Sequence, residues 1–240
     1  MKIIKALNRR ILCISDTHFP YHHRDTFRFL EAARDRYEID TALSVGDIND
    51  NHYPSYHELE PGTYDGETEL RKARESCQRL EELFPELLIT EGNHDALPLR
   101  KAKTARIPEG HIRNYNEVFG VGRGWQWVKQ AFLEVRRGEY VLVTHSVGSN
   151  ARTNASRFAH SSVQGHHHSE FGLHYYADNT SLRWHMGVGC LADPSSPAMN
   201  YASRAVFRRP ILGCGAIIDG APMLIPMVLN TSGRWTGRLP

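Results

Sequence analysis

Five short polar segments of this 240-residue chain carry the kinds of side chain that bind metal ions in proteins. In chain order they are SDTH at 15–18, GDIND at 46–50, EGNHD at 91–95, VTHS at 143–146 and GHHH at 165–168. Imidazole, carboxylate and amide oxygen together form a ligand set for divalent ions such as manganese, iron or zinc. Each segment alone is a weak signal, but all five in this order predict a metal site if the fold brings them together.

Strands must position these segments, because each segment directly follows a predicted buried strand. In the first half, short apolar runs at 9–15, 41–47 and 86–90 predict three of these strands. Apolar residues spaced three and four apart predict helices between them, at 24–37 and 67–84. Alternating strands and helices predict parallel pairing, in which the loops at the carboxyl ends of the strands converge.

The second half of the chain shows hairpin patterns instead. The three hairpins turn at Arg137-Gly138, Asp178-Asn179 and Asp219-Gly220. We therefore expect one domain, residues 1–240, mixed α/β in its first half and mostly antiparallel in its second, hence of class α+β or α/β. Its architecture would be a two-sheet β-sandwich flanked by helices.

Three long stretches without periodicity lie at 48–66, 96–128 and 146–162. Compact domains rarely carry such loops without a function, so lids or substrate walls are expected; the alternative is that some are disordered or contain short helices. The last stretch contains Arg152 and Arg157, whose guanidinium groups match phosphate geometry. Arg152 is the candidate for substrate binding, with an ordinary exposed loop as the alternative.

The composition is that of a soluble globular protein, with 40% hydrophobic and 23% charged residues. A formal net charge of +2 gives no argument for nucleic acid or an anionic membrane as partner. No apolar run approaches the ~20 residues that span a bilayer, and the first residues lack the pattern of a signal peptide. The cysteines form no C-x-x-C pair and are expected to be buried thiols in a reducing cytoplasm; they are Cys13, Cys77, Cys190 and Cys214.

The series D-x-H, G-D-x-x-D, G-N-H-D, H and G-H-x-H resembles the calcineurin-like metallophosphoesterase superfamily. The resemblance covers residue 11 to about residue 190, and the size of the chain resembles small stand-alone bacterial or phage-type members. It implies a four-layer αββα sandwich with two divalent ions at the strand ends. Many members have glycine after D-x-H, whereas this chain has Phe19-Pro20, a difference in the pocket wall that leaves the ligands intact.

The resemblance also implies a role for each polar side chain. The metal ligands would be Asp16, His18 and His168 at the first ion, Asn93, His145 and His166 at the second, and Asp47 as the bridge between them. His94 would be the general acid near the leaving group, with Asp50 orienting it. Manganese is the first choice of metal, with iron, zinc, nickel or magnesium as alternatives.

The three consecutive histidines of GHHH would differ in their roles. In an extended segment, alternate side chains point the same way. His166 and His168 would then face the two ions, and His167 would point away from them.

This ligand set suits phosphate ester hydrolysis, because two ions can clamp phosphate oxygens and activate a hydroxide. His94 could then protonate the leaving group, since the unperturbed pKa of histidine is about 6.5. The expected substrates are phosphate mono- or diesters, of nucleotides or nucleic acid, in the cytoplasm, or in the host cytoplasm for a phage-encoded protein. The alternatives are a DNA exonuclease or repair-type nuclease of the same superfamily and a non-catalytic scaffold with this fold.

Overall fold

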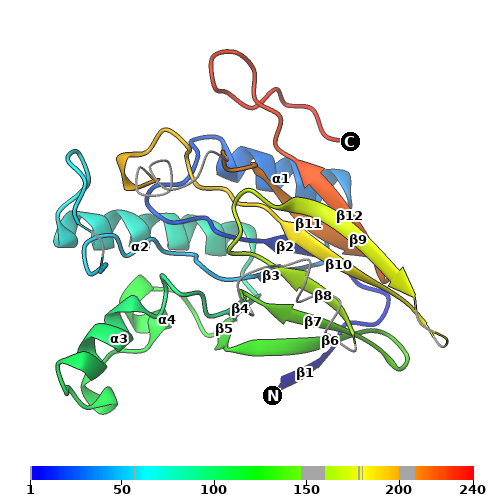
Figure 1. The fold of residues 1–240 in the computed structure, drawn as a ribbon, viewed down its shortest axis with the longest axis horizontal. Helices are drawn as coiled ribbons and strands as arrows, with labels where there is room; N and C mark the ends of the chain where they lie inside the picture. The colour runs from blue at the N-terminus through cyan, green and yellow to red at the C-terminus, as the bar shows by residue number, and fades with distance from the viewer. Residues whose placement is uncertain (1, 57, 147–159, 178, 180, 200–208) are drawn as a thin grey trace.

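The computed structural model describes residues 2–56, 58–146, 160–177, 179, 181–199 and 209–240, and its strands form two sheets (Figure 1). Sheet A contains, in spatial order, β1 (Lys2–Lys5), β6 (Gln130–Arg136), β7 (Glu139–Thr144), β8 (Ser161–Gln164), β10 (Leu182–Val188) and β9 (Phe171–Ala177). Sheet B contains β12 (Ala221–Pro226), β11 (Gly213–Ile218), β2 (Arg10–Ile14), β3 (Thr41–Ser44), β4 (Leu87–Thr90) and β5 (Trp125–Val128).

Helices flank this sandwich, as the sequence predicts. Those in the described part of the chain are α1 (Thr26–Arg36), α2 (Gly66–Leu83), α3 (Leu97–Thr104), α4 (Tyr115–Phe119) and the 3-10 helices η1 (Glu109–His111) and η2 (Pro197–Met199). The predicted helices at 24–37 and 67–84 correspond to α1 and α2. The two-sheet sandwich flanked by helices is therefore confirmed.

Sheet B separates two apolar layers, because successive side chains of a strand point to opposite faces. Leu12 belongs to the buried cluster that also contains Phe29 of α1 and Leu80 of α2. Its neighbour Ile11 belongs to a second cluster, with Met186 of sheet A. The first layer therefore holds the helices against sheet B, and the second joins the two sheets.

The parallel strands that carry the polar segments end at the same edge. β2 pairs in parallel with β3, and β3 with β4, as predicted. In sheet A, β7 and β8 are also parallel neighbours, and they are followed by VTHS and GHHH. All five polar segments thus lie at carboxyl ends of strands, which is the position where loops of an α/β sheet build sites.

The three predicted hairpins are present as β6–β7, β9–β10 and β11–β12, all antiparallel. Sheet A is nevertheless mixed, because β8 lies between β7 and β10 and is parallel to both. β8, the strand before GHHH, has only a weak sequence pattern, since its four residues, SSVQ, contain a single apolar side chain. The four-residue strands β1 and β5 are also too short to show a period.

The stretch 96–128 is not a loop. It contains α3, η1, α4 and β5, so the alternative that such stretches hold short helices is correct there. Most of 146–162 lies outside the described residues. All four cysteines are buried free thiols, as expected. Along the described residues, no helix combines the length and apolarity needed to cross a membrane.

Candidate metal centre

Four of the predicted ligands lie on backbone in the left-handed region. The φ angle is 48° at Asp16 and at His18, 47° at Asp47 and 69° at His166. This region is costly for residues with a Cβ, although aspartate and histidine adopt it more often than most. Residues held in this way concentrate at functional sites, where the surrounding structure offsets the cost.

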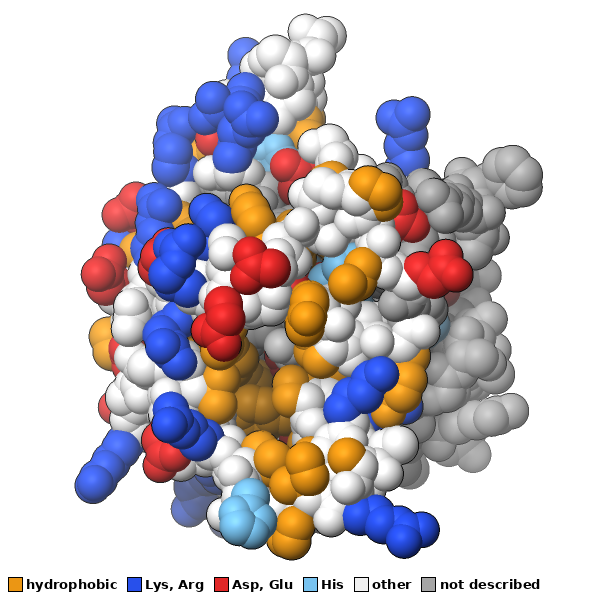
Figure 2. Space-filling model, turned by 90° about the vertical axis from the view of Figure 1, so that its left-hand side faces the viewer, with side chains coloured by type: hydrophobic (Ala, Val, Ile, Leu, Met, Phe, Trp, Pro, Cys, Tyr) orange, Lys and Arg blue, Asp and Glu red, His pale blue; other side chains and the backbone are white. Residues whose placement is uncertain are grey.

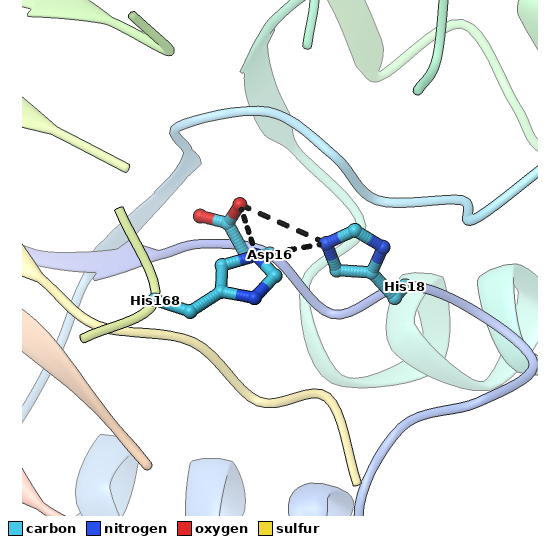
Figure 3. Close-up of side chains that lie close together, drawn as sticks. All are labelled: Asp16, His18 and His168. Carbon is cyan, nitrogen blue, oxygen red and sulfur yellow. Dashed lines mark hydrogen bonds and ion pairs between the residues drawn. The ribbon is translucent and has the colours of Figure 1, made fainter. Parts of the chain in front are cut away.

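Asp16, His18 and His168 form the first cluster of polar side chains (Figure 3). His168 Nε2 lies 3.1 Å from Asp16 Oδ1 and 3.1 Å from His18 Nε2. His18 Nε2 lies 3.8 Å from Asp16 Oδ1. Asp16 and His18 are fully buried, and His168 is slightly exposed, so the cluster has one side open to solvent.

Asp47, His145 and His166 form the second cluster. His145 Nε2 lies 3.1 Å from Asp47 Oδ2 and 3.0 Å from Asn93 Oδ1. The rings of His145 and His166 meet edge to face, with centroids 5.1 Å apart. Unlike the buried His145, Asn93 is exposed, so the second cluster also faces solvent.

Asp47 lies between the two clusters. Its Oδ2 atom is 3.1 Å from His145 Nε2 and 3.9 Å from His18 Nε2. Its other oxygen accepts a hydrogen bond from the backbone N–H of His94 at 2.8 Å. The carboxylate is thus fixed by the segment that carries Asn93 and His94.

Hydrogen bonds at the far side of two imidazoles show that these clusters suit cations. His18 Nδ1 bonds to the carboxylate of Asp50 at 2.7 Å, and His145 Nδ1 bonds to the carbonyl of Val45 at 2.8 Å. Because Nδ1 is the donor in both rings, the neutral form of each carries a lone pair at Nε2. Those lone pairs face carboxylate and amide oxygens, which are also acceptors. This convergence of acceptors, with the second ring nitrogen held by an oxygen, is the arrangement of metal-binding histidines.

The pKa shifts in this centre also indicate that it stabilises positive charge. Burial lowers the pKa of His145, but the neighbouring Asp47 carboxylate outweighs it and raises the pKa to about 9. Burial likewise opposes the charged form of Asp16, yet hydrogen bonds with His168 and His18 hold its pKa well below the usual range. Burial, together with His145, lowers the pKa of His166 to about 4, so that this imidazole is neutral at pH 7. The carboxylates thus create a negative potential that stabilises positive charge, and these residues fit divalent ions.

His94 and Asp50 lie beside the first cluster. His94 Nδ1 bonds to the backbone carbonyl of Asp50 at 2.6 Å, and it lies 3.6 Å from the carboxylate of Asp50. That carboxylate is closer to His18, as described above. Asp50 therefore holds two imidazoles, one through its side chain and one mainly through its backbone. With Nδ1 as donor to the carbonyl, the neutral ring of His94 carries its lone pair on Nε2.

Two glycines, for which the motifs predict no role, allow this close packing. A Cβ added at Gly92 would lie 2.0 Å from Asp47 Oδ1, and one added at Gly165 would lie 2.0 Å from Ser15 Oγ. A glycine directly before a predicted ligand, here Asn93 and His166, is the signal that could have identified them. Asp95 accepts the N–H groups of Asn49 and Gly92 and so joins two of the segments.

The GHHH segment is a turn rather than an extended strand. His166 has a positive φ, and the N–H of His168 bonds to the carbonyl of His166 at 3.1 Å. The argument from strand alternation is therefore wrong, although His166 and His168 do lie in different clusters. His167 is in neither cluster, and its ring contacts that of His166. Arg152 and Arg157 lie outside the described residues.

Solved structures share this fold. Vps29 from Chaetomium thermophilum is 11% identical, covers 97% of this chain and 93% of its own, and has a TM-score of 0.53. The phosphoesterase Yfce from E. coli is 10% identical over 95% of this chain and 96% of its own, with a TM-score of 0.47. A metallophosphoesterase from Sphaerobacter thermophilus is 17% identical over 90% and 86%, with a TM-score of 0.40. At these identities, the first likeness supports the fold alone, and the other two support no further argument.

The family comparison is more specific than the structural one. The search of curated proteins returned no match. The family model for Calcineurin-like phosphoesterase matches residues 9–190, which include all five polar segments. This match spans more than half of the chain, and the chain therefore belongs to the Calcineurin-like phosphoesterase family.

Proposed function

We propose that this protein is a hydrolase that uses two divalent ions to cleave phosphate mono- or diesters. The proposed substrates are esters of nucleotides or nucleic acid. The observation that carries the proposal is the convergence of lone pairs at the strand ends. Nε2 of His18 and Nε2 of His145 face carboxylate and amide oxygens, and each ring is fixed from its far side by an oxygen. A structural zinc site would use a closed set of four Cys and His ligands instead.

The proposed ligands follow the two clusters. Asp16, His18 and His168 would hold one ion, and Asn93, His145 and His166 the other, with Asp47 between them. When bound, the ions would neutralise phosphate oxygens and lower the pKa of a water molecule towards about 7. Manganese is the proposed metal, because the set mixes imidazole nitrogen with carboxylate and amide oxygen.

His94 is the proposed general acid. Its Nδ1 is held by the carbonyl of Asp50, so the proton exchanged with the leaving group would be the one on Nε2. The Asp50 carboxylate also lies near Nδ1, with 3.6 Å between Asp50 Oδ1 and His94 Nδ1. A partly exposed histidine beside a buried cluster can reach a substrate oxygen without being a ligand itself. His94 has an exposed side-chain fraction of 13%, against 0% for His18.

The test is a hydrolysis panel with the purified protein and Mn²⁺. The panel contains a phosphomonoester, a phosphodiester, cyclic nucleotides, and single- and double-stranded DNA, and bound metal is measured in the same preparations. Hydrolysis that is lost in Asp47→Asn together with bound metal supports the proposal. If nothing is hydrolysed and Asp47→Asn leaves the metal content unchanged, the protein is a scaffold and the proposal is wrong. Turnover of DNA alone would identify the nuclease alternative.

The role of His94 is tested by separating metal content from turnover. His94→Ala is expected to keep its bound metal and to lose about 10²–10⁴-fold in turnover, which is the usual contribution of a general acid. The expected loss is larger for substrates with poor leaving groups, because those need the proton most. Equal losses of metal and turnover would show instead that His94 is a ligand.

A further inference from the structure

A cavity of about 780 Å³ lies between α2 and the segment that runs from the end of β4 to α4. Figure 2 faces this side of the molecule and shows a hollow with hydrophobic side chains. A volume in the range of roughly 300–1,000 Å³ is that of pockets for small organic ligands. The cavity is therefore large enough for a ligand of this class.

The cavity is separate from the metal centre but adjoins it. Neither His94 nor any of the seven proposed metal ligands lines it. Its wall includes Asn51, whose Nδ2 donates to the carbonyl of His94 at 2.9 Å. It also includes Asp95, which directly follows His94 in the chain. The segment with the proposed general acid thus forms a partition between the two sites.

Aromatic and aliphatic side chains form much of the cavity surface. The buried Phe19 and Phe119 are among its lining residues, and Tyr115 and Tyr53 contribute further rings. Tyr115 is fixed, because its hydroxyl donates to the carboxylate of Glu91 at 3.1 Å and its ring stacks on Trp127. Rigid rings of this kind bind apolar ligands and present their negative faces to cations.

Carboxylates supply the charge of the cavity. The acidic residues that line it are Asp65, Glu67, Glu69, Glu91, Asp95 and Glu109. Among the described lining residues, Arg113 is the one cation. In the part of the chain that the structure describes, no Lys or Arg forms an ion pair with these carboxylates; the partners that they have are N–H and O–H groups. The described lining of the cavity therefore combines apolar walls with an excess of acidic over basic side chains, six to one.

Glu69 is a buried carboxylate in the wall of this cavity. It is 4% exposed, and its two oxygens accept the N–H groups of His52 and Tyr53 at 2.6 and 2.9 Å. Burial raises the pKa of Glu69 to about 7, and the carboxylate of Asp50 adds to the rise. A positive ligand in the cavity would offset both effects.

We propose that this cavity is a second binding site, for a small organic cation with an aromatic or other apolar body. The rings would hold the apolar body and face its positive charge, and the carboxylates would provide charge complementarity. A polyanion such as a nucleic acid strand would be repelled. The site goes beyond the proposed hydrolysis, because it needs neither the metal ligands nor His94.

The proposal is tested by calorimetric titration of the full-length protein with three probes of similar size. They are benzyltrimethylammonium, benzyl alcohol and phenylacetate, which carry a positive charge, no charge and a negative charge. The cation is expected to bind with a Kd at least about tenfold below those of the other two, since cation–π contacts and carboxylates act together. Equal affinities for the three probes would overturn the proposal.

Substitutions locate the binding in this cavity. Val118→Trp and Leu99→Trp each place a large ring in the space from a partly buried wall position, and either is expected to weaken cation binding at least tenfold. Glu67→Gln combined with Glu109→Gln removes two exposed carboxylates and should weaken it several-fold. Glu82→Gln is the matched control, because Glu82 is exposed on α2 and does not line the cavity. Unchanged affinity in a folded Val118→Trp or Leu99→Trp protein would show that the cation binds elsewhere and would refute the site.

This experiment is independent of the hydrolysis panel. None of the substituted residues is a proposed ligand or the general acid, and the readout is binding rather than turnover. Loss of cation binding with intact hydrolysis, or the reverse, would assign each failure to one proposal.

Discussion

Replacing Gly92 by alanine tests whether the position of Asp47 controls the metal centre. The added Cβ would lie 2.0 Å from Asp47 Oδ1 and 2.3 Å from Asp47 N, whereas real Cβ atoms keep at least 3.0 Å. The carboxylate oxygen must therefore retreat by about 1 Å, and the backbone nitrogen by slightly less. The carboxylate is held, because Asp47 Oδ1 accepts the N–H of His94 at 2.8 Å, and the backbone is held through the Asp47 carbonyl, which accepts the N–H of His18 at 3.0 Å. The local structure cannot relax without moving the carboxylate away from His145.

The expected size of the effect follows from that shift. Misplacement of a reacting or ligating group by about 1 Å costs about 10²-fold in turnover. Disturbed ligand orientation costs about 10–100-fold in metal affinity. Overpacking at a buried position destabilises a fold by about 1–3 kcal/mol, which is a few degrees in Tm for a domain of this size. Gly92→Ala should thus remain folded and lose metal and activity together.

The assay compares bound manganese, kcat/KM on the substrate identified by the panel, and Tm for three proteins. The third protein, Gly110→Ala, is the matched control, because a Cβ at Gly110 meets nothing within 4 Å. That variant should behave like the unaltered protein. If Gly92→Ala keeps full metal content and full activity, Asp47 does not need its observed position, and the assignment of the bridging carboxylate is refuted.

Three further outcomes are expected. Asp50→Asn should lower metal affinity by about tenfold and should also lower turnover, because the carboxylate holds His18, whereas the carbonyl that holds His94 remains. A lower turnover with unchanged metal affinity would mean that the bond to His18 is unimportant. His168→Ala should lose metal, whereas His167→Ala should keep metal and activity, as measured by metal analysis and the hydrolysis assay. Metal loss in His167→Ala would contradict the assignment of His168, and not His167, to the first cluster. The metal-free protein should lose the roughly 3 kcal/mol of stability that His145 contributes, as measured by urea unfolding, when pH rises from about 6.5 through 9. The pKa of His145 is about 9 in the fold and about 6.5 in the unfolded chain, so its contribution is fully present below about 6.5 and is lost as pH rises through 9. Saturating metal displaces that proton and should remove this dependence, and a metal-free protein whose stability is constant over this range would contradict the charge coupling of His145 with Asp47.

The sequence predicted the elements whose periodicity is strong. Strands β2, β3 and β4, helices α1 and α2 and the three hairpins all follow from apolar spacing and turn residues, which are local properties. The pattern is weak at β8, and it failed in the stretch 96–128, where the elements are too short to show a period. Their conformation depends on strands and helices that lie far away in the chain, and a local pattern does not contain that information.

The chemistry of the candidate centre divides in the same way. The sequence by itself determined which side chains are present, their order, and their place after strands, because residue types and strand ends can be recognised from neighbouring residues in the chain. The tertiary structure decided which atoms meet. His168 reaches Asp16 across 152 residues, and the carboxylate of Asp50 holds His18 rather than His94 as its nearest ring. The left-handed turn at His166 separates the histidines of GHHH, which strand alternation does not explain. Such contacts depend on the packing of two sheets and on backbone angles that neighbouring residues in the sequence do not specify.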